Sequence, residues 1–208
     1  MAKSKQLREN PLFLRNEFDS VGEYNIPIVK KQKLDTDNIK LIAYSNIRSS
    51  LSLFDKMKGV HFFVDDNKFN GIYDNPKKSI DRISRFLYTL TPDYSLYIEM
   101  AKSIQIMNVY KNRWLGAYWQ SKGLTVIPTV SWSLAQSFEF CFDGIEKGSI
   151  VAVSTVGCLK SRLNFLRGYN ELLNRIEPEK VICYGKIFKE MDGNIISVPY
   201  NRNRKEVI

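Results

Sequence analysis

Ser149-Ile150-Val151-Ala152-Val153-Ser154 and Lys180-Val181-Ile182-Cys183-Tyr184 are two short apolar runs, and a helical segment separates them. Neither run alternates between apolar and polar residues, which is typical of strands that are covered on both faces. Residues 161–176 between them place one apolar face on a helix: Phe165, Leu166, Tyr169, Leu172, Leu173 and Ile176. Pro178 ends this helix before the second run. A strand–helix–strand succession predicts two parallel strands joined by a right-handed crossover.

The same alternation extends over most of the chain. Further strands are predicted at Leu41–Ser45, Val60–Val64, Thr89–Pro92 and Thr125–Val130. Residues 195–200 would add an edge strand after a turn at Asp192-Gly193. We therefore expect an α/β fold of about six mainly parallel strands alternating with helices, as an incomplete (β/α)-barrel-like sheet or an open doubly wound sheet. The absence of a glycine-rich turn after the first strand favours the barrel-like form.

The chain shows no internal repeat and no linker, so we expect a single α/β domain over residues 1–208 with short basic N- and C-terminal extensions. Its 31 Lys and Arg against 22 Asp and Glu give a net charge of +9, which favours polyanionic partners. No apolar run reaches the length of about 18 residues that a membrane helix needs, so we expect no membrane partner.

The cysteines and the histidine restrict the possible chemistry. Cys141, Cys158 and Cys183 are widely spaced and form no CxxC pair, which fits a reducing cytoplasmic location. His61 is the one histidine among the 208 residues, so a site with several histidine ligands is excluded. His61 stands near the start of its predicted strand and Cys158 beyond the end of another. We therefore expect them at opposite ends of the sheet, which argues against Cys–His catalysis.

Polar residues follow every predicted strand. Ligands of parallel α/β proteins bind at the carboxyl ends of the strands, so these residues are the first candidates for a site. We expect one rim of the sheet to carry Asn46, Asp65, Asp66, Asp93, Trp132, Thr155 and Tyr184.

Three of these residues are carboxylates with possible catalytic roles. Asp65, Asp66 and Asp93 could together bind a divalent metal such as magnesium, or could transfer protons. The alternative is that Asp65-Asp66-Asn67 and Pro92-Asp93 only form turns and helix caps.

The turn between the fifth strand and its helix is a candidate phosphate site. Backbone N–H groups near Thr155 and Gly157, together with Lys160 and Arg162, could hold an anion at the helix N-terminus. Ser154 and Leu159 stand where a nucleotide-binding GxxxxGK[ST] loop has glycines, so that motif is absent. An ordinary βα loop capped by Ser161 is the alternative.

The longest helix is predicted from about Met100 to Lys122 and contains no acidic residue. Its apolar face is expected in the core and consists of Met100, Ile104, Met107, Trp114, Leu115 and Tyr118. The opposite face carries Gln105, Asn108, Asn112, Arg113, Trp119 and Gln120. Arg113, Trp119 and Gln120 would suit contact with nucleic acid or a nucleobase, whereas the alternative is a solvated face with Trp119 packed under a neighbouring loop.

Several phrases, in order along the chain, resemble one known family. They are Val60-His61-Phe62-Phe63-Val64-Asp65-Asp66, Thr91-Pro92-Asp93-Tyr94-Ser95, Asn112-Arg113-Trp114 with Tyr118-Trp119-Gln120, residues 126–132 and Phe140-Cys141-Phe142-Asp143-Gly144. Over about residues 11–186 the chain resembles the domain-of-unknown-function family 4417 of bacteria, phages and mobile elements. The resemblance implies a phage or mobile-element setting and supplies no activity and no catalytic residues.

Three functions agree with these observations. The first is a cytoplasmic phage or mobile-element protein that acts on nucleic acid, or on a nucleotide or other phosphate-bearing ligand, at the strand ends. The second is a factor without catalysis that docks on DNA or on a host protein. The third is an enzyme for a small phosphorylated substrate, which would show a closed pocket over residues 155–162.

Overall fold

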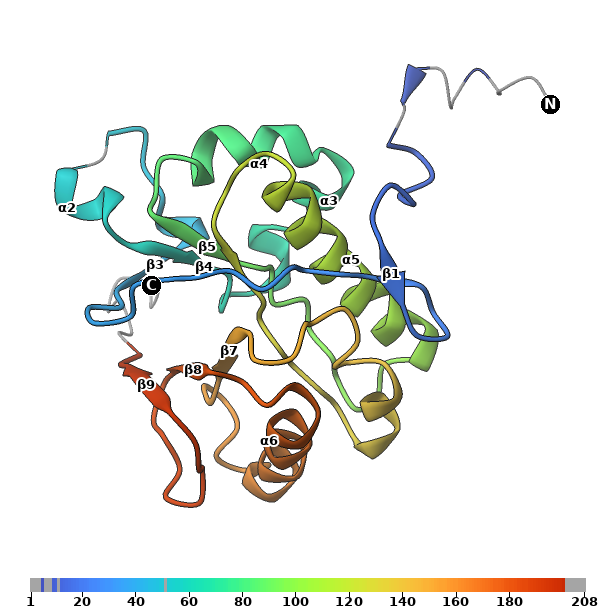
Figure 1. Cartoon of the computed structure of the whole chain (residues 1–208), viewed down its shortest axis with the longest axis vertical. Helices are drawn as coiled ribbons and strands as arrows, with labels where there is room; N and C mark the ends of the chain where they lie inside the picture. Colours follow the sequence, from blue (N-terminus) through green and yellow to red (C-terminus); the bar gives the residue numbers. More distant parts are fainter. Residues whose placement is uncertain (1–4, 6–8, 11, 51, 201–208) are drawn as a thin grey trace.

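The computed structural model describes residues 5, 9–10, 12–50 and 52–200 (Figure 1). Most of the predicted basic extensions, residues 1–9 and 201–208, therefore lie outside the described residues. Within the described residues, no helix is long and apolar enough to cross a membrane.

Parallel strands follow one another in space in the order in which they occur in the chain. One sheet consists of β3 (Leu41–Ala43), β4 (Gly59–His61), β5 (Tyr88–Leu90) and β6 (Val126–Ile127), and a second of β7 (Ile150–Ser154), β8 (Lys180–Tyr184) and β9 (Ile195–Val198). A parallel bridge between Thr129 and Ala152 joins the two sheets between β6 and β7. The α/β class and the parallel strands are confirmed, and β9 is the edge strand expected at residues 195–200.

The combined sheet curls until strands that are not neighbours touch. The His61 ring, at the end of β4, lies 4.6 Å from the Tyr184 ring at the end of β8. The concave side is filled by one apolar cluster drawn from five strands: Tyr88, Leu90, Ile127, Ile150, Ala152, Ile182, Tyr184 and Val198. Among the described strands β3 and β9 do not pair, so the barrel stays open. The strand order and curvature agree with the incomplete barrel-like alternative.

Helices cover the outer face of the curved sheet. In Figure 1, α3 (Gly71–Asp74), α4 (Pro76–Ile83) and α5 (Lys102–Gln120) lie on the side of β3–β5, and α6 (Arg162–Ile176) lies by β7–β9. Pro76 occupies the first helical position of α4, as predicted. Proline is favourable there because a backbone N–H at the first position of a helix has no carbonyl partner within the helix. Under α5, Trp114, Leu115 and Trp119 pack with Val60 and Phe62.

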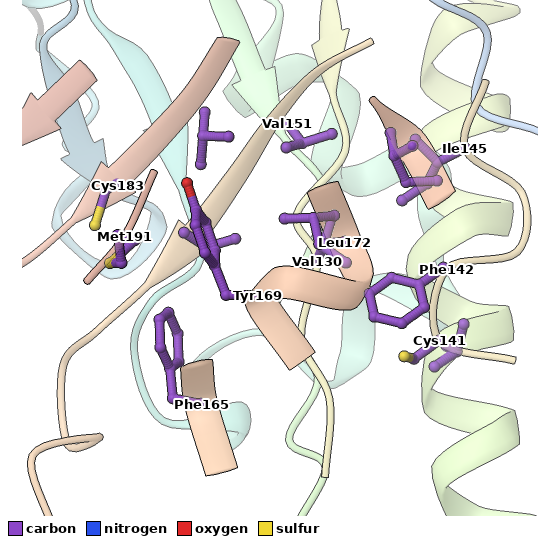
Figure 2. Close-up of a cluster of buried hydrophobic side chains, with 14 of the residues drawn as sticks. Val130, Cys141, Phe142, Ile145, Val151, Phe165, Tyr169, Leu172, Cys183 and Met191 are labelled. Carbon is purple, nitrogen blue, oxygen red and sulfur yellow. The ribbon is translucent and has the colours of Figure 1, made fainter. Parts of the chain in front are cut away.

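The core under α6 agrees with the predicted apolar face of residues 161–176. Figure 2 shows Phe165, Tyr169 and Leu172 in the same cluster as Val151 and Cys183. Alternate residues of β7 and β8 face this cluster, and the residues between them face the interior of the curl. Both faces of these strands are therefore buried, which explains their unbroken apolar sequence.

Short elements complete the chain. They are the antiparallel pair β1 (Ser20–Val21) and β2 (Ile26–Pro27), the helix α2 (Leu53–Lys56), and the 3₁₀ turns Tyr44–Asn46, Asp66–Lys68 and Ala135–Glu139. The strands of the first sheet are shorter than predicted. Residues 62–64, which continue an apolar run after β4, already belong to the connection that leads to the site.

The orientation predicted for the long helix is wrong at two places: residues predicted in the core are exposed in its first half, and the face predicted to be exposed is buried. Ile104 is 50% exposed and Met107 47% exposed, whereas Arg113 is 2% and Trp119 0% exposed. Gln105, Asn108 and Asn112 are buried as well. The reason is that these amides and the guanidinium donate hydrogen bonds to backbone carbonyls inside the protein. Trp114, Leu115 and Tyr118 are buried as predicted.

Candidate functional site

A cleft of about 1200 Å³ opens where the parallel strands end. Each of the seven parallel strands contributes lining residues, either from the strand or from the segment directly after it. Five of the seven residues predicted on the rim line this cleft: Asn46, Asp65, Asp93, Trp132 and Tyr184. The other two, Asp66 and Thr155, lie directly beside lining residues in the sequence.

The cleft follows the open seam, which we define as the gap between residues 41–43 of β3 and residues 198–200 at the end of β9. Leu41, Ile42 and Ala43 are half-buried, and Tyr200 is exposed. An unclosed barrel therefore leaves its interior accessible from the side as well as from the carboxyl ends of the strands.

The Asp66 carboxylate forms hydrogen bonds inside the protein. Its carboxylate accepts hydrogen bonds from the Ser95 N–H (3.2 Å) and from the Ser95 hydroxyl (2.8 Å). The Asn108 side chain in turn donates to the Ser95 carbonyl (2.8 Å). Asp66 therefore fixes the loop after β5 against the turn after β4.

Asp93 lines the cleft at the carboxyl end of β5. Burial raises its pKa to about 7, and the nearby charge of Asp66 acts in the same direction. A carboxyl group that titrates near neutral pH is suited to give or take a proton at that pH. Of the three predicted carboxylates, Asp93 thus has the environment expected of a proton-transfer group.

The predicted metal site has no geometric support. Among the residues that the structure describes, no three His, Cys, Asp or Glu side chains are grouped so that they could hold a metal ion. Asp65 is exposed at the cleft, while the Asp66 carboxylate is bonded to Ser95. Binding of a divalent metal such as magnesium by Asp65, Asp66 and Asp93 stays a prediction.

His61 and Cys158 line the same cleft, so the expectation that they lie at opposite ends of the sheet is wrong. The apolar run Val60–Val64 continues past the end of β4, which spans Gly59–His61. His61 is therefore the last residue of the strand, and not one of its first residues as the sequence suggests. Burial lowers the pKa of His61 to about 4 and raises the pKa of Cys158 to about 11, with Asp93 contributing to the latter. A neutral imidazole and a protonated thiol that share no hydrogen bond do not constitute an activated nucleophile.

Arg113 is buried, which contradicts its predicted contact with nucleic acid. Its guanidinium donates to the carbonyls of Thr129 (2.9 Å), Cys141 (2.8 Å) and Asp143 (3.0 Å). The neighbouring Asn112 donates to the carbonyls of Pro92 and Thr129. These two side chains of α5 thereby fix the segments that lead to Asp93 and to Trp132, two residues of the cleft.

Trp119 and Gln120 are also engaged inside the fold. The Trp119 indole N–H donates to the Ser79 hydroxyl (3.1 Å), and its ring stacks on Phe62 at 5.7 Å. Gln120 exchanges two hydrogen bonds with the backbone of Lys30. The predicted exposed indole is therefore wrong, and the alternative of a packed Trp119 agrees with the structure.

The predicted phosphate loop contributes only part of the cleft. Val156 and Cys158 line it, whereas Gly157, Lys160 and Arg162 do not. Arg162 forms an ion pair with Glu190, and Thr155 is buried under Gly185. Lys160 is exposed, and Ser161 makes no side-chain capping bond to α6.

Trp132 is both a lining residue and a packing residue. Its ring lies 5.1 Å from Phe165, and it packs so closely on α6 that a Cβ on Gly168 would lie 2.2 Å from the indole nitrogen. Only glycine leaves room for this indole, so the sequence of α6 fixes one wall of the cleft.

Three lysines of the cleft were missed by sequence reasoning: Lys40, Lys58 and Lys68. Lys58 is paired with Asp55 at 2.8 Å, while no described residue forms an ion pair with Lys40 or Lys68. Lys40 and Lys58 come directly before β3 and β4, so a search of the strand ends alone does not find them. Lys68 lies in the turn after β4, so an inspection of the residues that follow each strand can identify it.

Comparison with known proteins identifies a matching family model and two similar phage proteins. A family model described as "Domain of unknown function (DUF4417)" matches residues 18–201. The Gene 1 protein of Mycobacterium phage L5 is 39% identical over 181 residues, which cover 85% of this chain and 77% of that protein. The Gene 1 protein of Mycobacterium phage D29 is 35% identical over 204 residues, covering 94% of this chain and 75% of that protein. No solved structure matches the chain.

Proposed function

The chain belongs to the Domain of unknown function (DUF4417) family, and from this premise we propose that its cleft binds a phosphate-bearing ligand of the nucleotide or single-stranded nucleic-acid class. The observation that carries the proposal is the composition of the cleft, in which lysines, polar strand ends and aromatic rings line one accessible space. The similarity to two phage proteins supports a phage setting.

Charge supports an anionic ligand. Lys40 and Lys68 line the cleft without an ion-pair partner among the described residues, and Asp65 is the exposed carboxylate there. Asp93 is largely protonated below its pKa of about 7, so the charge of the two lysines then exceeds that of the carboxylates. Positive charge in a concave site raises the local concentration of anions and contributes most of the affinity of proteins for phosphate backbones.

Size and shape support a nucleotide. Typical small-molecule sites measure roughly 300–1,000 Å³, so a cleft of about 1200 Å³ accommodates a mononucleotide or a short single strand. Phe63, Trp132 and Tyr200 line the same space and offer flat apolar surfaces. Bases stack on such rings without requiring a particular sequence.

Proton transfer at the bound ligand is the chemistry that the cleft could supply. Asp93 is the candidate for proton transfer because it lines the cleft and titrates near neutral pH. The Asp66 carboxylate, in contrast, is hydrogen-bonded to Ser95. The enzyme hypothesis thus rests on Asp93.

Equilibrium binding tests the proposal. We expect mononucleotides and short single-stranded oligonucleotides to bind, with weaker binding of inorganic phosphate alone. Lys68→Gln should reduce affinity about threefold or more, because one charge-assisted contact contributes on the order of 1 kcal/mol. The matched control is Lys147→Gln, whose side chain pairs with Glu177 and does not line the cleft. Absence of nucleotide binding, or equal loss in both variants, contradicts the proposal.

Docking on a partner protein is the second candidate. Leu53, Phe54 and Met57 are exposed apolar residues in and after α2, and Lys40 and Lys58 both lie over the Phe54 ring. Exposed apolar side chains with a basic rim are typical of protein interaction surfaces. Leu53→Ser should leave nucleotide affinity unchanged and abolish partner binding if this function is the correct one, because Leu53 is 81% exposed and does not line the cleft.

A further inference from the structure

We propose that His61 is a ligand-binding residue of the cleft, whose Nε2–H donates a hydrogen bond to an acceptor of a nucleobase. This inference rests on the proposed nucleotide-binding function and assigns the base to one part of the cleft. His61 lines the cleft and is otherwise only 4% exposed. A buried ring at the edge of a cleft has a fixed orientation, which a binding group requires.

The hydrogen bond at the other ring nitrogen determines which nitrogen carries the proton. The backbone N–H of Phe63 donates to His61 Nδ1 at 3.2 Å, so Nδ1 is the acceptor. A neutral imidazole with Nδ1 as acceptor carries its proton on Nε2. Burial lowers the pKa of His61 to about 4, which keeps the ring neutral at physiological pH. No hydrogen bond of the described residues involves Nε2, and Nε2 is not among the fully enclosed side-chain atoms that lack a partner, so it is open to the cleft.

The surroundings of His61 favour a base over a phosphate. The ring lies 4.6 Å from Tyr184 and 5.6 Å from Phe63, and Tyr200 lies 5.8 Å from Tyr184. The neutral His61 N–H thus lies in a cluster with three aromatic side chains, and all three line the cleft. A neutral N–H beside flat apolar rings matches the ring nitrogen or carbonyl oxygen of a stacked base, whereas the lysines are the better partners for phosphate.

One histidine in 208 residues makes the test direct. In protein labelled with ¹⁵N at histidine, the long-range ¹H–¹⁵N spectrum should show one imidazole with its proton on Nε2. Addition of a mononucleotide should shift the Nε2 and Nε2–H resonances, while inorganic phosphate or ribose 5-phosphate should leave them in place. A proton on Nδ1, or an unshifted His61 in protein that has bound the nucleotide, overturns the inference and leaves the proposed function standing. Failure of any nucleotide to bind refutes both.

Two substitutions separate the two ring nitrogens. His61→Asn retains an acceptor at the place of Nδ1 for the Phe63 N–H and removes the Nε2 donor, so we expect nucleotide affinity to fall about tenfold. His61→Gln retains a donor near the place of Nε2 and should bind within about threefold of the unsubstituted protein. Affinity for inorganic phosphate should be equal in both variants. The reverse order of affinities contradicts the inference, and circular dichroism verifies that each variant folds.

Discussion

A single side chain, Arg113, connects two segments of backbone, one at Thr129 and one at residues 141–143. It donates to carbonyls of Thr129, Cys141 and Asp143, and burial lowers its pKa to about 10. In the sequence, an arginine that shares one face of an acid-free helix with amides and Trp119 favours a surface contact. Periodicity cannot show that buried carbonyls two loops away need donors, because those carbonyls become neighbours only in the folded protein. The polar residues of α5 were therefore assigned to the wrong face.

Replacement of Arg113 tests this role. Arg113→Met fills a similar volume but leaves the carbonyls of Cys141 and Asp143 without their donor and leaves the Thr129 carbonyl with Asn112 alone. We expect the free energy of unfolding to fall by about 3–5 kcal/mol, measured by urea denaturation. Arg167→Met on the exposed side of α6 is the control and should change stability by less than about 0.5 kcal/mol. Equal effects of the two substitutions would show that Arg113 has no special structural role.

Asp93 should make stability depend on pH. Its pKa is raised to about 7 in the folded protein from the usual 3.8, so the folded state keeps a proton that the unfolded state releases. The stabilisation is complete below the unfolded pKa and disappears as the pH rises through the folded pKa. Relative to Asp93→Asn, the protein should thus lose up to about 4 kcal/mol between about pH 4 and about pH 8.

Urea denaturation of both proteins across this pH range provides the measurement. His61 has the opposite dependence, because its lowered pKa of about 4 makes stability rise with pH between its folded and unfolded pKa values. This contribution is common to the protein and to Asp93→Asn and cancels in their difference. A difference that stays constant with pH would mean that Asp93 has an ordinary pKa.

Among the elements, those with an uninterrupted pattern could be predicted from the sequence. The helix predicted at 161–176 is α6, and both flanking strands match β7 and β8 because each buries two faces. The end of β4 could not be predicted, since Phe62, Phe63 and Val64 extend the apolar run for a different reason. Phe62 packs under Trp119, and Phe63 turns into the cleft. That error placed His61 at the wrong end of the sheet.

The contact between α6 and the segment after β6 depends on Gly168. Alanine is normally the better residue in a helix, by about 1 kcal/mol, but a Cβ at this position would lie 2.2 Å from the Trp132 indole. We expect Gly168→Ala to displace Trp132, to lower stability by about 1–3 kcal/mol, and to change tryptophan fluorescence.

Gly71→Ala in α3 is the matched control for this substitution. A Cβ there would meet nothing within 4 Å, and the position is helical. It should therefore be neutral or stabilising by up to about 1 kcal/mol. If Gly168→Ala behaves like Gly71→Ala, the close packing of Trp132 on α6 does not exist in solution.

For the whole molecule, the net charge of +9 has a different meaning once the fold is known. Of the bases near α5, Arg113 is buried and Lys102 is paired with Glu139. Lys111 and Lys122 are the remaining basic residues of this region, about three turns apart, and they lie over the rings of Tyr73 and Tyr118. The uncompensated lysines of the site lie in the cleft, at Lys40 and Lys68. Any electrostatic binding of a polyanion to this site should accordingly depend on a few charges and not on the total.

The salt dependence of binding measures how many charges of the protein contact phosphates of the ligand. Each phosphate neutralised on a single strand contributes about −0.7 to the slope of log K against log salt concentration. Contact with Lys40 and Lys68 alone should give a slope near about −1.4 for a short single-stranded oligonucleotide, and the double variant Lys40→Gln/Lys68→Gln should bring it close to zero. Lys147→Gln, outside the cleft, should leave the slope unchanged. A much steeper slope that survives the double substitution would place the polyanion on another surface, because counterions would then be released from charges that the cleft does not contain.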